Sequence, residues 1–110
     1  MTIIHVVKFQ FKELIPQDEV NRICESMLAL KDKCIHPTSK KTYIKSMVGG
    51  LDNSPEGMQS GITHVFVAEF ENAEDRDHYV FKDPAHLAFV EEAGKVILKA
   101  RVVDFTPGVF

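Results

Sequence analysis

The 110-residue sequence has no tryptophan, only two cysteines, and no long run of apolar or basic residues. Cys24 and Cys34 form neither a CxxC pair nor the set of bridges that holds a small secreted domain together. We therefore expect free thiols in a cytoplasmic protein. The longest apolar runs fall far short of the roughly 20 residues that cross a bilayer, and the N-terminus begins directly with a strand pattern. We expect neither a membrane segment nor a signal peptide.

A strong excess of charge of either sign is also missing. The chain carries 13 lysines and arginines against 16 aspartates and glutamates, which gives a formal net charge of −3. Because nothing concentrates positive charge, we expect neither nucleic acid nor an anionic membrane as a partner. The length suits a single domain spanning 1–110, and a 45% share of hydrophobic residues is ordinary for a protein with one core.

What the sequence does contain is a regular succession of strand and helix patterns. Alternating apolar residues and turn signals predict strands over 2–12, 41–49, 62–71 and 97–105. An apolar stripe that includes Val20, Met27 and Leu28 predicts a helix from Pro16 to about residue 31. Asn72 and Asp83 are the expected N-caps of two further helices, over about 73–81 and 84–96.

The resulting order, β-α-β-β-α-β, is that of a ferredoxin-like split βαβ unit. This is an α+β fold with one antiparallel four-stranded sheet and helices on one face. The opposite face of the sheet would then carry apolar side chains that no helix covers: Ile4, Val6, Val65, Val67 and Val103. An apolar face of that size indicates a partner, and the simplest partner is a second copy of the chain. We therefore expect a homodimer in which two sheets face each other like a barrel.

Three histidines and one tyrosine are candidates for chemistry. By strand parity, His5 and His64 lie on the helix-facing side of two strands that are adjacent in this fold. His86, in the first turn of the last helix, and Tyr79, at the end of the preceding helix, can reach the same layer. Buried polar groups are costly unless they pair, so the cluster is either a set of satisfied core residues or a binding site. No HxxxH or HExxH spacing is present, and we expect no metal.

Four stretches of the sequence carry a family resemblance: IIHVVKFQFK, GITHVFVAEFE, DPAHLAF and VVDFTPG. On these motifs, which extend over nearly the whole chain, the protein resembles the stress-responsive dimeric α/β-barrel (Dabb) domain family. The resemblance implies the ferredoxin-like monomer and the homodimer. The family is mixed in function. One plant enzyme within it closes a linear polyketide by an intramolecular aldol condensation, with no metal or cofactor and with a tyrosine and a histidine as its catalytic pair.

When the catalytic pair of that cyclase is matched to this sequence by motif, the resemblance implies that His86 is the general base and that Tyr79 is a hydrogen-bond donor. His5 and His64 are then the supporting histidines. The interval from Tyr79 to His86 is one residue longer here than in that cyclase. A small apolar poly-carbonyl ligand and no cofactor are expected. The expected pocket-lining residues are Phe9, Ile23, Met27, Phe66 and Val102. Two alternatives stay open: a non-catalytic stress-responsive or ligand-binding homodimer and, by fold analogy alone, a cofactor-free or haem-linked oxygenase.

Overall fold

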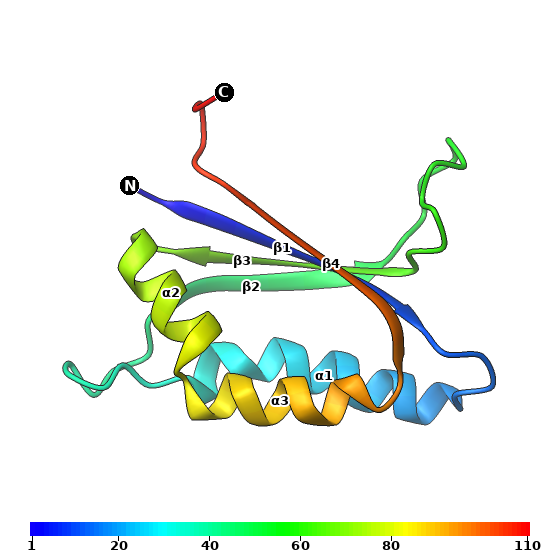
Figure 1. Ribbon diagram of the computed structural model, residues 1–110, viewed down its shortest axis with the longest axis horizontal. Helices are drawn as coiled ribbons and strands as arrows, with labels where there is room; N and C mark the ends of the chain where they lie inside the picture. Colours follow the sequence, from blue (N-terminus) through cyan, green and yellow to red (C-terminus); the bar gives the residue numbers. More distant parts are fainter.

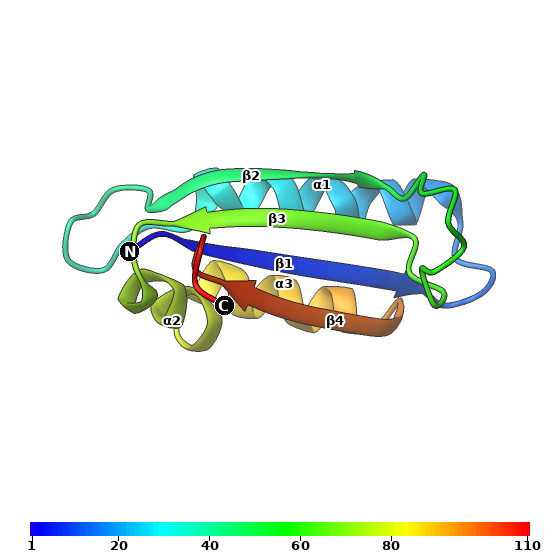
Figure 2. The same ribbon diagram turned by 90° about the horizontal axis from the view of Figure 1, so that it is seen from above.

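The computed structural model describes the whole chain, Met1–Phe110, as a four-stranded sheet with three helices on one face (Figure 1). The strands are β1 (Ile3–Phe11), β2 (Ile44–Leu51), β3 (His64–Phe70) and β4 (Ile97–Phe105). The helices are α1 (Gln17–Lys33), α2 (Ala73–Phe81) and α3 (Pro84–Gly94). The strands lie in the order β2-β3-β1-β4, and every neighbouring pair is antiparallel (Figure 2). The predicted ferredoxin-like α+β fold is confirmed.

Alternation along the central strands decides which side chains the helices cover. In β1, Ile3, His5, Val7 and Phe9 are buried, while the residues between them lie half-buried on the other face. The helix-facing side of β3 is buried in the same way from Phe66 to Phe70. Successive strand residues point to opposite faces, so one sequence pattern specifies both the core face and the open face of the sheet.

Helix α1 begins where it was predicted and buries a slightly different stripe. Pro16 occupies the N-cap position, and Val20, Met27 and Leu30 are among the buried residues of the helix. Leu28 was expected in this stripe, but its side chain is 39% exposed, so that prediction is wrong. The residues of α1 that contact the sheet recur every third or fourth position, and Leu30 is the last of them.

The two short helices that follow β3 each begin with a side-chain N-cap. Asn72 accepts a hydrogen bond from the Asp75 amide at 2.8 Å, and Asp83 accepts one from the Ala85 amide at 2.9 Å. Pro84 follows at the first helical position, where its missing N–H costs nothing. Both predicted N-caps are therefore confirmed. None of the three helices has the length and apolar character of a membrane span.

The face of the sheet opposite the helices carries no covering element (Figure 1). Val48, Val103 and Phe105 are 62%, 51% and 50% exposed, although all three are apolar. Strand pairing sets Val67 beside both Val6 and Val48, which makes the apolar patch continuous across neighbouring strands. A monomer with this surface leaves a large apolar area in water.

Candidate functional site

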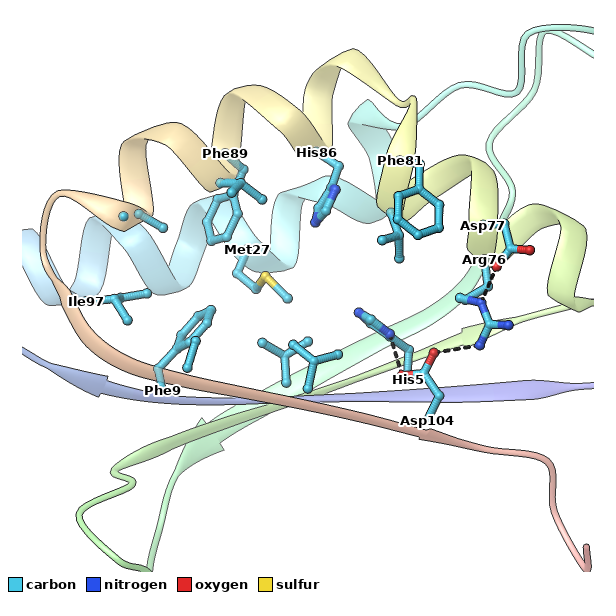
Figure 3. A pocket seen from close by; sticks show the side chains of 17 residues that line it. His5, Phe9, Met27, Arg76, Asp77, Phe81, His86, Phe89, Ile97 and Asp104 are labelled. Atoms are coloured by element: carbon cyan, nitrogen blue, oxygen red, sulfur yellow. Dashed lines mark hydrogen bonds and ion pairs between the residues drawn. The ribbon is translucent and has the colours of Figure 1, made fainter.

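A cavity of about 680 Å³ lies between the sheet and α3, and α2 supplies part of its wall (Figure 3). Of its 17 lining residues, 11 are hydrophobic, so the interior is mainly apolar. The apolar side chains include Phe9, Met27, Phe89, Val90, Ile97 and Val102. This volume is within the usual range for sites that hold a small organic molecule.

One end of the cavity is polar and contains His5, Asp104 and Arg76 (Figure 3). His5 and Asp104 are directly opposite each other in β1 and β4, and the His5 Nδ1 atom lies 2.7 Å from Asp104 Oδ1. Arg76 of α2 donates to the other Asp104 oxygen at 2.8 Å. Since a carboxylate only accepts hydrogen bonds, Nδ1 of His5 carries the proton in this contact, and its Nε2 is left free for a ligand.

His86 reaches the same cavity from the opposite wall, on the first turn of α3 (Figure 3). Its side chain makes no hydrogen bond, and its Nδ1 atom is buried without a partner. Burial, together with the nearby His5, lowers the pKa of His86. The imidazole is therefore neutral at physiological pH and able to accept a proton.

Tyr79 lies behind His86 and does not line the cavity. Its side chain is 0% exposed, and its ring packs on the His86 ring with centroids 4.1 Å apart. The Tyr79 hydroxyl is buried without a hydrogen-bond partner, and burial raises its pKa. The next residue, Val80, lines the cavity instead. The expected closeness of Tyr79 to His86 is confirmed, but the expectation that its hydroxyl faces a ligand is wrong.

His64 is not part of this cluster. It is paired with Phe9 of β1, whereas His5 is paired with Ala68, four positions further along β3. At about 3.3 Å per residue, this offset separates the two histidines by roughly 13 Å along the sheet. His64 instead contacts the Thr63 hydroxyl at 2.8 Å. Parity placed His64 on the correct face, but the prediction that it joins His5 is wrong, because parity says nothing about position along a strand.

The model of the Stress responsive A/B Barrel Domain matches residues 3–107 of the chain. The chain belongs to this family. Among solved structures, it is similar to At3g17210 from Arabidopsis thaliana, with 26% identity, a TM-score of 0.84 and coverage of 98% of this chain and 97% of that one. A hydroxynitrile lyase from Passiflora edulis has 20% identity, a TM-score of 0.84 and coverage of 99% and 96%.

A third neighbour among solved structures is a dimeric ferredoxin-like protein of unknown function from Thermobifida fusca. It has 20% identity, a TM-score of 0.72 and coverage of 96% of this chain and 91% of that one. At this identity, the lyase and the Thermobifida fusca protein support the fold alone. No curated protein matches the chain significantly in sequence.

Three of the five predicted pocket residues of this A/B barrel protein do line the cavity: Phe9, Met27 and Val102. The other two, Ile23 and Phe66, are 0% and 1% exposed and belong to the closed core, so those two predictions are wrong. Both were on the correct face of their element. The cavity is lined by several residues of β4, among them Val102 and Asp104, whereas Ile23 and Phe66 are packed within the hydrophobic core.

Sequence reasoning missed three charged residues of the A/B barrel cavity: Asp104, Arg76 and Asp77. Asp104 stands in an apolar strand, two positions after Val102, and strand parity therefore places both on the helix-facing side. An acid on that side, opposite His5, was a usable signal. Arg76 lies between Asp75 and Asp77, in a charged segment of the kind that usually faces solvent on a helix, and its contact with Asp104 depends on how α2 docks.

Proposed function

We propose that this A/B barrel protein is a cofactor-free enzyme that forms or breaks a carbon–carbon bond beside a carbonyl group, in the manner of a polyketide cyclase. The single observation that carries the proposal is the pair of histidines, His5 and His86, on opposite walls of one apolar cavity. Two imidazoles facing one ligand can move a proton without a metal or a cofactor. The apolar lining suits a substrate that is mostly hydrocarbon and carbonyl.

In the proposed step, neutral His86 accepts a proton from a carbon that lies between two carbonyl groups. The resulting enolate carbon attacks a more distant carbonyl carbon of the same chain and forms the new carbon–carbon bond. The electron pair of that carbonyl moves to its oxygen, which takes the proton back from His86 directly or through His5. The ring is closed at this point. Removal of the second proton from the attacking carbon, with departure of the new hydroxyl group as water, gives a double bond, and enolisation of the remaining ring carbonyl groups makes the ring aromatic. Asp104 holds the His5 ring in place during this transfer.

This proposal modifies the role that the family resemblance implied for Tyr79. The Tyr79 hydroxyl is buried and Tyr79 does not line the cavity, so the direct polar contacts with a substrate are assigned to His5 and His86. Tyr79 packs against His86 and limits how far that ring can turn. The name of one fold neighbour, a hydroxynitrile lyase, is compatible with the same broad class of chemistry.

A direct test is the ring closure of a linear triketo methyl ester, whose aromatic product is followed by ultraviolet absorbance. We expect the native protein to accelerate closure over the spontaneous reaction. His86→Ala should lower the rate about 100-fold, the lower end of what a positioned general base contributes. His64→Ala is the matched control, because His64 lies on β3 outside the cavity and away from His5. Equal rates for the native protein and His86→Ala would reject the assignment.

We also propose that two chains pair through the open sheet face as a homodimer. The apolar side chains of that face support this proposal, as does the dimeric state named for the Thermobifida fusca neighbour. A non-catalytic, ligand-binding dimer is the second candidate, and the buried Tyr79 favours it because the expected hydrogen-bond donor is withdrawn from the cavity. The ring-closure assay separates the two: such a dimer binds the triketo ester without accelerating its closure.

A further inference from the structure

Asp83 is a buried carboxylate at the start of α3, three positions before His86. It is 1% exposed, and its two oxygens are both engaged. Oδ2 accepts a hydrogen bond from the Tyr43 hydroxyl at 2.6 Å, and Oδ1 accepts one from the backbone amide of Ala85 at 2.9 Å. The buried thiol of Cys34 also lies close to Asp83. Burial of the thiol, and to a smaller extent the negative charge of Asp83, raises the Cys34 pKa to about 12.

Capping the helix does not explain why this residue carries a charge. Asn72 caps the neighbouring helix α2 with a neutral amide and the same kind of hydrogen bond. Neutral Asn and Ser caps are about as effective as Asp. Burying a carboxylate, by contrast, costs several kcal/mol that only well-placed donors offset. Two donors, from Tyr43 and Ala85, therefore surround a carboxyl group at a position where the cap itself needs only one neutral acceptor.

The group that this charge can act on is His86. Burial and the proximity of His5 lower the His86 pKa, while the backbone of Tyr79, the charge of Asp83 and the backbone of Val80 oppose that shift. Among the three opposing influences, Asp83 is the only ionisable side chain. The other groups around the ring come from several elements. Tyr79 of α2 packs on its face, and Arg76, Asp77 and Asp104 line the same cavity. Of the carboxylates named, Asp83 alone is shut away from both solvent and cavity.

We propose that Asp83, held by Tyr43, is a positioning residue for His86: it fixes the helix turn that presents the imidazole, and its charge stabilises the ring when it accepts a proton. The inference deepens the proposed function and rests on it, since it gives the general base a fixed counter-charge. Without such a charge, a buried imidazole is a weak base. With it, His86 can take up a proton inside an apolar cavity.

The test is an NMR titration of the His86 ring in the native protein and in Asp83→Asn, which keeps the size and capping oxygen of the side chain and removes its charge. We expect the His86 pKa to fall by at least about half a unit in the variant. Asn21→Asp, which adds a carboxylate on the exposed side of α1, is the control and should leave the titration unchanged. An unchanged His86 pKa in folded Asp83→Asn would overturn the inference.

A second measurement covers the case in which Asp83→Asn does not fold. In the native protein, the carboxyl carbon of Asp83 should show a chemical-shift step at the His86 midpoint, because coupling between two charges is reciprocal. Absence of that step would also overturn the inference. Neither readout needs a substrate. Failure of the ring-closure assay alone would therefore reject the proposed reaction and leave the link between Asp83 and His86 intact.

Discussion

Burial sets the chemistry of individual side chains around the cavity. His86 and Tyr79 are stacked at the junction of α2 and α3, and each has a buried polar atom with no partner. For His86, burial favours the neutral ring. For Tyr79, burial removes the hydroxyl from any ligand. Each effect leads to a separate measurement.

The lowered pKa of His86 predicts how stability depends on pH. The unfolded chain, with a histidine pKa of about 6.5, binds more protons than the folded protein between that value and the folded pKa. Stability from this group is therefore complete above pH about 6.5 and is lost as the pH falls through the folded pKa. We expect thermal denaturation to show a smaller loss between pH about 7.5 and 5.5 in His86→Gln than in the native protein. An equal loss in both would contradict this expectation.

The unpartnered hydroxyl predicts the effect of Tyr79→Phe. The variant keeps the ring that packs on His86 and removes a buried polar group that makes no hydrogen bond. We expect the free energy of unfolding to stay the same or rise by up to about 1 kcal/mol, measured by urea denaturation. Ring closure should be unaffected. Tyr43→Phe is the contrasting variant, because it removes a hydroxyl that Asp83 uses, and it should destabilise the protein.

At the scale of elements, the packing of β2 on β3 depends on one glycine. A Cβ atom at Gly49 would overlap the Phe66 ring, whereas one at Gly50 would meet nothing within 4 Å. Because Phe66 is 1% exposed, its ring cannot move aside freely.

We therefore expect Gly49→Ala to lower the free energy of unfolding by about 1–3 kcal/mol, the usual cost of overpacking a core. Gly50→Ala is the matched control, one position along the same strand, and should cost much less. Denaturation of the two variants in urea measures the difference. Similar stabilities would mean that the sheet adjusts at β2.

Element types and faces could be predicted from the sequence, and contacts between elements could not. The alternation in β1 and the caps at Asn72 and Asp83 are local signals, and each is confirmed. The separation of His64 from His5 depends on strand register, which a face pattern alone does not specify. The withdrawal of Tyr79 depends on the rotation of α2, where one additional residue turns a side chain by about 100°.

At the scale of the whole molecule, the open sheet face determines the proposed assembly. Val67 lies in the centre of that face, beside Val6 and Val48. A glutamate there would bury a charge between two sheets. We expect Val67→Glu to be monomeric by light scattering at a concentration where the native protein is dimeric. Leu28→Glu, which adds the same charge on the helix layer, should remain dimeric. A dimeric Val67→Glu would exclude this face as the interface.

The pairing of β1 with β4 joins the two ends of the chain at the cavity. His5 and Asp104 touch although 99 positions separate them in the sequence. During synthesis, the strand that carries His5 leaves the ribosome long before the strand that carries Asp104. The polar end of the cavity therefore cannot form until β4 has emerged and paired with β1. A nascent polypeptide that stops before β4 lacks this contact altogether, so any activity that depends on it requires the completed sheet.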